Sequence, residues 1–208
     1  MGYKSHWDRV YSVKSDSELS WTQQEPRVSL ELIREVLPRG RVIDVGGGGS
    51  PLAGRLLDAG YAVAVLDLSA TALDRARKTL GSRAAEVRWI TGDVTALTDV
   101  GAFDLWHDRA AFHFLTVPQD RRRYIALLSR SVPIGGHAVM ATFALDGPEK
   151  CSGLDVVRYD GPSLGRELGP EFRLLKTVPE IHLTPWGQRQ SFQYSVFIRE
   201  GERNGGGN

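Results

Sequence analysis

The stretch Val42–Ser50, with the sequence VIDVGGGGS, decides the fold class of this 208-residue chain. It continues a short apolar run that starts at Arg41 and predicts a buried strand as far as Val45. Four glycines follow, and then a helix is predicted from Leu52 to Ala59, closed by Gly60. A strand, a glycine-rich turn and a helix in this order let a helix N-terminus and bare backbone approach a ligand closely.

The alternation of strand and helix continues on both sides of this stretch. Upstream, residues 27–37 carry apolar groups at helical spacing and stop at Pro38-Arg39-Gly40. Downstream, strands are predicted at 62–68, 87–91, 103–107 and 137–144, and helices at 69–80 and 119–132. Such alternation is typical of a parallel sheet with helices on both faces.

The C-terminal part follows a different pattern. Residues 172–183 and 191–199 are two β-rich runs joined by Thr184-Pro185-Trp186-Gly187, which predicts an antiparallel hairpin at one end of the sheet. With the five preceding strands, the fold class is α/β: a Rossmann-like, seven-stranded, mostly parallel sheet with an antiparallel C-terminal hairpin.

Composition narrows the classes of partner. The formal net charge is +1, which gives no reason to expect a nucleic acid or an anionic membrane. No apolar run is long enough for a membrane span, and the polar N-terminus is not a typical secretory or transit signal. Cys151 is the only cysteine, so neither an intramolecular disulfide nor a cysteine-based zinc site is expected, and no metal is predicted. The expected location is the cytoplasm.

Acidic residues end the first three predicted strands. Asp44 precedes the glycines, Asp67 ends the second strand, and Gly92-Asp93 end the third. The carboxyl edge of an open α/β sheet is where ligands bind. A carboxylate at Asp67 suits the ribose of any nucleoside ligand. Asp44 suits a cationic amino group, such as that of S-adenosylmethionine (SAM), and would repel a pyrophosphate. Pro51 occupies the position where a dinucleotide fingerprint needs Gly or Ala.

These motifs resemble those of the class I SAM-dependent methyltransferases. VIDVGGGGS is similar to their motif I, with Ser50 in place of the last glycine, and VLDLS at 65–69 is similar to their second motif. TGDVT at 91–95 resembles the third, and the segments 103–115 and 133–143 resemble the motifs around strands four and five. More loosely, WDRVY, SWTQQEP and WHDRAAFHFLT are similar to a set of small bacterial methyltransferases related to eukaryotic protein-lysine methyltransferases.

The resemblance implies one methyltransferase domain over 1–200, with SAM as cofactor and S-adenosylhomocysteine as product. Within it, 1–38 would be an N-terminal helical or lid segment, 40–145 the SAM-binding core, and 146–200 an acceptor loop and the closing hairpin. A disordered tail is expected at 201–208. The residues expected to bind the cofactor are Trp21, Asp44, Gly46, Gly47, Gly48, Asp67, Leu68, Gly92, Asp93, Val94 and His107.

Candidate catalytic groups cluster after the fourth predicted strand. Asp108 or His113 can orient or deprotonate an acceptor, and Arg109 can hold an anionic one. Ordinary packing explains the histidines equally well, and a helix N-cap explains Asp108. Cys151 lies in a long stretch, 146–162, expected to be irregular and to line an acceptor pocket.

The acceptor is expected to be a small molecule or a protein side chain, because the sequence contains neither the Asn/Asp-Pro-Pro-Tyr segment nor the Pro-Cys nucleophile of nucleic-acid methyltransferases. Two alternatives stay open at this point: an NAD(P)-type oxidoreductase and a SAM-binding protein without catalysis.

Overall fold

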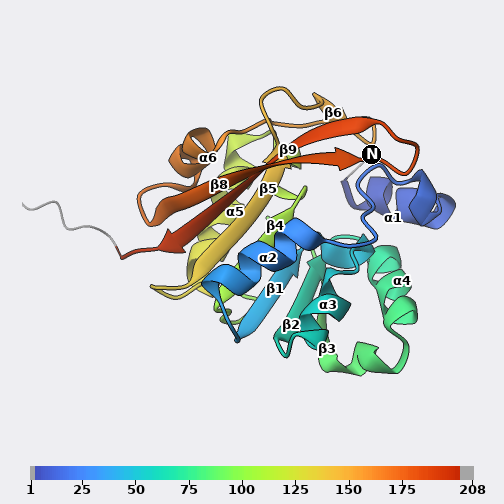
Figure 1. Ribbon diagram of the computed structural model, residues 1–208, viewed down its shortest axis with the longest axis horizontal. Helices are drawn as coiled ribbons and strands as arrows, with labels where there is room; N and C mark the ends of the chain where they lie inside the picture. Colours follow the sequence, from blue (N-terminus) through green and yellow to red (C-terminus); the bar gives the residue numbers. More distant parts are fainter. Residues whose placement is uncertain (1–2, 202–208) are drawn as a thin grey trace, which may run out of the picture.

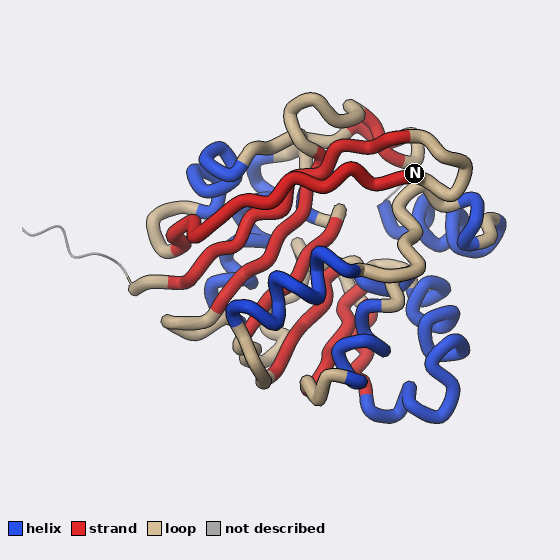
Figure 2. Tube along the Cα trace, viewed as in Figure 1, coloured by secondary structure: helices blue, strands red, loops and turns tan. Residues whose placement is uncertain are grey.

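A computed structural model describes residues 3–201 of the chain, and its centre is one seven-stranded sheet (Figures 1 and 2). The strand order is β3-β2-β1-β4-β5-β9-β8. This is the predicted Rossmann-like arrangement, so the fold class is confirmed. The predicted disordered tail at 201–208 lies outside the described residues apart from Gly201.

The first five strands are parallel and the last two antiparallel. The parallel strands are β1 (Arg41–Val45), β2 (Ala62–Asp67), β3 (Val87–Thr91), β4 (Leu105–Arg109) and β5 (His137–Phe143). The hairpin consists of β8 (Phe172–Leu183) and β9 (Arg189–Arg199). Strand β9 lies between β5 and β8, so it is hydrogen-bonded along both edges, and β8 is an edge strand of the sheet.

Helices cover both faces of the sheet (Figure 1). One face packs against α2 (Arg27–Val36) and α3 (Leu52–Asp58), the other against α5 (Pro118–Ser131) and α6 (Gly161–Leu168). Helix α4 (Ala70–Leu80) borders β2 and β3, and α1 (Tyr3–Val13) packs beside α4. Successive side chains of each strand point to opposite faces of the sheet, so the apolar side chains form two cores, one on each face.

Two predictions about local structure were incomplete. Strand β4 begins at Leu105 and runs on to Arg109, two residues past its predicted end, because the polar side chains of its last three residues all find partners inside the protein. The stretch 146–162 contains a small hairpin, β6 (Lys150–Cys151) and β7 (Leu154–Asp155), and the start of α6.

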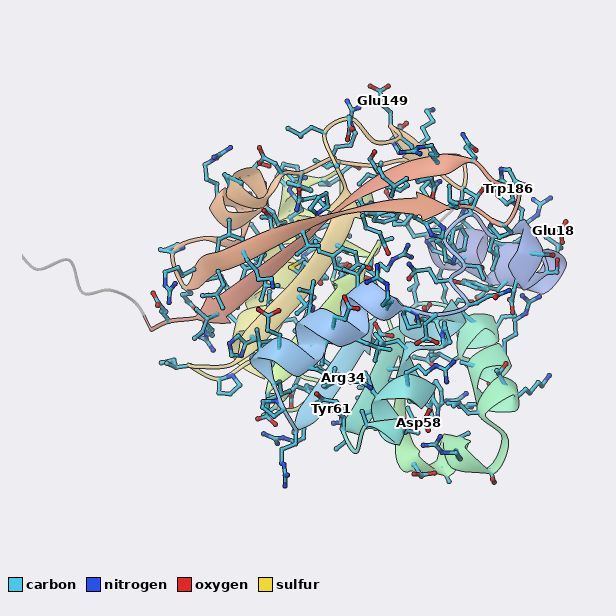
Figure 3. The ribbon with its side chains drawn as sticks, viewed as in Figure 1. Glu18, Arg34, Asp58, Tyr61, Glu149 and Trp186 are labelled. Carbon is cyan, nitrogen blue, oxygen red and sulfur yellow. The ribbon has the colours of Figure 1, made fainter. Side chains whose placement is uncertain are left out.

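Beside the C-terminal hairpin, the outer surface of the molecule includes the loop after β5 and the turn between β8 and β9. Figure 3 shows Glu149, on the loop after β5, and Trp186, in the turn between β8 and β9, on the outer side of the molecule. The carboxyl ends of β2, β1 and β4 lie side by side in the parallel part of the sheet.

Candidate active site at the carboxyl edge of the sheet

The glycine loop after β1 is compact. Gly46 has a left-handed conformation with φ of 73°, which favours glycine, and Gly47–Gly49 form one turn of 3-10 helix, η2. A Cβ on Gly47 would lie 2.1 Å from the Asp44 carboxylate. Ser50, the one departure from the motif, accepts a hydrogen bond from the backbone N–H of Leu52 at the start of α3 (3.1 Å). The departure from glycine therefore helps to begin the helix.

Asp67 at the end of β2 is bound to this loop. Its Oδ2 accepts from the N–H of Gly48 (3.0 Å) and its Oδ1 from the N–H of Ser69 (2.8 Å). Burial raises the pKa of Asp67 to about 6, and the two backbone hydrogen bonds oppose this rise. Each carboxylate oxygen has a second lone pair, so both can still accept from a ligand's hydroxyl groups.

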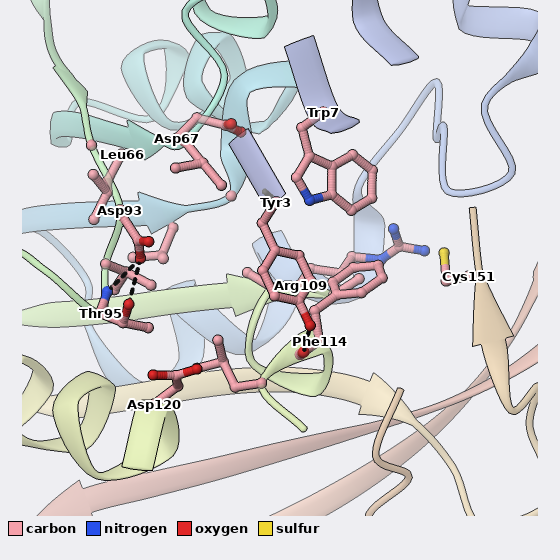
Figure 4. Close-up of a pocket in the computed structure, with 18 of the residues that line it drawn as sticks. Tyr3, Trp7, Leu66, Asp67, Asp93, Thr95, Arg109, Phe114, Asp120 and Cys151 are labelled. Atoms are coloured by element: carbon pink, nitrogen blue, oxygen red, sulfur yellow. Dashed lines mark hydrogen bonds between the residues drawn. The ribbon is translucent and has the colours of Figure 1, made fainter. Parts of the chain in front are cut away.

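A cavity, here called the main cavity, opens beside Asp67 (Figure 4). Asp67 and Asp93 lie on one side of it, and Arg109 and Cys151 lie toward the other. Asp93 Oδ1 accepts from the backbone N–H and the hydroxyl of Thr95, at 2.8 and 2.7 Å. The predicted cofactor residues that line this cavity are Trp21, Gly46, Asp67, Leu68, Gly92, Asp93 and Val94.

Aromatic side chains from the N-terminal segment line the main cavity as well. Trp7 of α1 packs edge-on against Trp21, with centroids 5.5 Å apart, and against Phe114, at 5.0 Å. The hydroxyl of Tyr3 donates to the carbonyl of Phe114 (3.3 Å), and Tyr11 also reaches the cavity. The N-terminal segment thus covers the carboxyl edge of the sheet, where a lid was predicted.

A second, smaller cavity, here called the glycine-loop cavity, lies between the glycine loop and α2. Asp44, Gly46, Gly47 and His107 line it. His107 Nδ1 lies 2.7 Å from Asp44 Oδ1, and both side chains are 2% exposed. His107 therefore lies behind Asp44 and fixes the orientation of that carboxylate.

A chain of hydrogen bonds continues from His107 to Arg109. His107 Nε2 lies 2.9 Å from the Ser29 hydroxyl, which lies 3.3 Å from the Tyr194 hydroxyl, and Arg109 Nε donates to Tyr194 (3.1 Å). Because a guanidinium only donates and a carboxylate only accepts, the two ends of this chain are fixed: Arg109 donates to Tyr194, and Asp44 accepts from His107.

Arg109 itself lines both cavities. Its Nη1 donates to the carbonyl of Trp21 (3.0 Å), and its guanidinium stacks over Phe192 at 4.5 Å. Its Nη2 lies 3.8 Å from Glu180. Ala110, next along the chain, has a left-handed φ of 67°, a conformation that is rare outside glycine and is often found at functional sites.

Asp108 lines neither cavity. It is completely buried on the α5 face and accepts from the N–H groups of Ala111 (2.9 Å) and Phe112 (3.0 Å) and from the hydroxyl of Tyr124 (2.5 Å). Burial raises the pKa of Asp108 to about 6. These contacts match the capping role considered above, and its catalytic role stays a prediction that they do not support.

His113 is also completely buried and lines neither cavity. Its Nδ1 accepts from the backbone N–H of Phe143 (3.3 Å), and its ring packs against Phe114 and Phe143. Burial lowers the pKa of His113 to about 3, so the ring is neutral at pH 7. Its catalytic role likewise stays a prediction, and ordinary packing accounts for its contacts.

Sequence patterns did not identify several residues of the site. Ser29 lies on an apolar helix face, and Tyr194 lies in an alternating apolar strand, so both were hidden among core residues. Two polar residues of β8 also lie in this region: Glu180 pairs with Arg109, and His182 is buried with its Nε2 2.7 Å from the carbonyl of Ser20.

Cys151 lines the main cavity and is buried. Burial raises the pKa of the thiol to about 11, so it is protonated at pH 7 and is a weak nucleophile. Within residues 3–201, the structure contains no group of three or more His, Cys, Asp or Glu side chains that could hold a metal ion. The helices in the same range are too short or too polar to cross a membrane.

Comparison with known proteins identifies the core of this site. Residues 42–136 match the family model described as "Methyltransferase domain", and this range contains the glycine loop, Asp67 and Asp93. This part of the chain is thus similar to a methyltransferase domain. The resemblance predicted from the motifs is therefore confirmed.

Solved structures share the fold of this chain. A structure from work on the conversion of a disulfide bond into a thioacetal group during echinomycin biosynthesis has a TM-score of 0.80 and 21% identity, covering 98% of this chain and 95% of that one. The N-methyltransferase NodS of Bradyrhizobium japonicum, in complex with S-adenosylhomocysteine, has a TM-score of 0.72 and 16% identity, covering 96% of this chain and 98% of its own.

A curated relative, the eEF1A lysine and N-terminal methyltransferase of Danio rerio, is 24% identical over 144 residues. The match covers 67% of this chain and 21% of that protein, so the chain spans about a fifth of the relative's length.

Proposed function

We propose that this protein transfers a methyl group from SAM to an acceptor and releases S-adenosylhomocysteine. The observation that carries the proposal is the line of Asp44, Asp67 and Asp93 at the carboxyl ends of three neighbouring parallel strands, with a glycine loop between the first two. Asp44 would meet the ammonium group of SAM, Asp67 the ribose hydroxyls, and Asp93 the adenine amino group.

The residues fit this cofactor. Asp44 Oδ2 is buried and makes no hydrogen bond within residues 3–201, and an ammonium group would satisfy it. Asp67 would accept from the ribose, while Asp93 and the neighbouring Val94 would meet the adenine. Bound SAM supplies an activated methyl group, and the chain's own task is to orient an acceptor and exclude water. Trp7, Trp21 and Phe114 can do the latter.

We favour a small molecule as acceptor over a protein side chain. Four aromatic residues of the N-terminal segment line the main cavity, Tyr3, Trp7, Tyr11 and Trp21, and such a covering segment suits a ligand that can be enclosed. The N-methyltransferase whose solved structure contains 1,6-didemethyltoxoflavin and S-adenosylhomocysteine, from Burkholderia thailandensis, covers 95% of this chain at a TM-score of 0.70 and 17% identity. The relationship to the eEF1A methyltransferase keeps a protein acceptor as the alternative. A cytoplasmic location stays a prediction.

Calorimetry with SAM, S-adenosylhomocysteine and NAD tests the cofactor assignment. We expect the first two to bind and NAD not to bind. Binding of NAD alone would support the oxidoreductase alternative and refute the proposal. The acceptor is then sought by incubating the protein with labelled SAM and, separately, thiols, amines, carboxylates and lysate proteins. SAM binding without transfer to any acceptor would favour the non-catalytic alternative.

A further inference from the structure

One end of the main cavity lies away from the acids assigned to the ribose and the adenine. Figure 4 shows Asp67 and Asp93 on one side of the cavity, and Arg109 and Cys151 toward the other. This part, here called the Cys151 end, is lined by Cys151, Arg109, Trp7, Trp21 and Phe114. A cofactor whose nucleoside lies at the two acids leaves the Cys151 end as the place for an acceptor.

Most walls of the Cys151 end are apolar. The ring of Trp7 packs edge-on against the rings of Trp21 and Phe114, with centroids 5.5 and 5.0 Å apart. Rings that fix one another in this way present a steady surface to a flat apolar molecule. Because burial raises the pKa of Cys151 to about 11, its thiol is uncharged at pH 7 and acts as a small apolar group.

Arg109 supplies the charge at this end. Among residues 3–201, it is the only cationic side chain that lines the main cavity. Its Nη2 is buried and makes no hydrogen bond within that range, and the side chain is 10% exposed. Glu180 lies 3.8 Å from Nη2, which offsets charge but is too far for a hydrogen bond. Since a guanidinium only donates, Nη2 calls for an accepting atom that the chain does not supply.

The walls are held in place by the protein itself. The guanidinium of Arg109 stacks over Phe192 at 4.5 Å, and its Nε and Nη1 already donate to partners in the chain. The β6–β7 hairpin, which carries Cys151, is fastened where the backbone N–H of Val157 donates to the carbonyl of His113 (2.8 Å). Binding of an acceptor therefore requires little ordering of these walls.

We infer that the Cys151 end binds the methyl acceptor, and that this acceptor is a flat apolar molecule whose acidic group accepts a hydrogen bond from Arg109 Nη2. This inference rests on the proposed function. Carboxylates, phenolates and thiolates on an aromatic body share this chemistry. A cationic amine, such as a protonated lysine side chain, does not, because it only donates and is repelled by Arg109. Arg109 is thereby a residue that determines acceptor specificity.

Acids and amides of matched shape test this inference on the unchanged protein. The probes are benzoate and benzamide, phenylacetate and phenylacetamide, and the cationic benzylamine. The Kd of each is measured by ligand-observed NMR titration, with S-adenosylhomocysteine bound at saturation. We expect at least one acid to bind about 10- to 100-fold more tightly than its amide, the range of a charge-assisted hydrogen bond, and benzylamine to bind more weakly than either acid.

Variants then locate the preference for the acid. Arg109→Gln should lower the affinity for the preferred acid to that of its amide, and should leave the affinity for the amide and for S-adenosylhomocysteine unchanged. Arg158→Gln is the matched control and should change none of these affinities. Arg158 contacts Gly147 and Glu149 and lines neither the main cavity nor the glycine-loop cavity.

The outcomes separate this inference from the proposed function. If S-adenosylhomocysteine does not bind, the proposed function fails. If it binds but neither acid exceeds its amide, or benzylamine binds as tightly as the acids, the inference alone fails, whether or not any variant folds. Equal weakening of acid and amide in Arg109→Gln would indicate a merely structural role and overturn the inference. Weakened S-adenosylhomocysteine binding with an unchanged preference for the acid would also overturn it.

Discussion

Asp67 should control both the affinity for adenosine-type ligands and its pH dependence. In Asp67→Asn, one oxygen is replaced by an amide NH₂ that faces the backbone N–H of either Gly48 or Ser69 and cannot accept from it. At least one charge-assisted bond to the ribose is lost, which costs about 2–3 kcal/mol. The Kd of S-adenosylhomocysteine should therefore rise roughly 30- to 150-fold.

The pH dependence follows from the pKa of Asp67, which burial raises to about 6. Ribose hydroxyls donate to the ionised carboxylate, so ligand binding favours the charged form. Affinity should be constant above about pH 7 and fall as the pH drops through about 6, by up to about tenfold per pH unit. The asparagine variant should lack this dependence.

Calorimetry between about pH 5 and pH 8 measures both effects. Asp74→Asn is the matched control, because Asp74 is an exposed acid on α4 that forms an ion pair with Arg77 and lines neither cavity. The ribose assignment is wrong if Asp67→Asn changes the Kd by less than about threefold, or if the acid dependence persists in the variant.

Three further substitutions test the frame of the site. Gly48→Ala should destabilise the protein and weaken cofactor binding, because the new Cβ would lie 2.7 Å from the Cβ of Ala72. The melting temperature should fall by about 2–4 °C per kcal/mol of stability lost, and an unchanged melting curve would contradict this. Asp108→Asn should cost about 1–3 kcal/mol in denaturant unfolding through its lost bond to Tyr124 while folded protein still binds cofactor; an inactive variant of unchanged stability would restore a catalytic role. The neutral His113 ring makes the free energy of unfolding sensitive to acid. Its contribution is fully present above about pH 6.5 and falls by up to about 1.4 kcal/mol per pH unit toward the folded-state pKa of about 3. His113→Gln should remove this pH dependence, and parallel pH profiles of the two proteins would refute the assignment.

The sequence predicted the sheet and its ligand-binding edge because both depend on local patterns. Apolar runs bounded by glycine and acids located β1, β2 and β3 nearly residue by residue. Parallel strands must end at one edge, so Asp44, Asp67 and Asp93 could be grouped without coordinates. Helix α6 was missed because Gly161, Pro162 and Gly165 weaken its pattern, although Asp160 caps it by accepting from Ser163.

Strand β4 shows where local patterns failed. His107, Asp108 and Arg109 are polar enough to suggest a loop, yet they continue a buried strand. Their side chains alternate between the two faces, so Asp108 meets Tyr124 on one face, while His107 and Arg109 meet residues of α2 and β9 on the other. Partners so distant in sequence leave no local signal.

The same alternation separates structural from functional roles in this strand. A one-residue step turns Asp108 away from both cavities and into the α5 core, where its buried oxygens hold the turn after β4. The residues on either side of it face α2, where His107 orients Asp44 and Tyr194 orients Arg109. An acid between two cationic or ionisable side chains suggested a catalytic cluster, but the two-residue period of the strand places the acid in the core and its two neighbours on the face that lines the glycine-loop cavity.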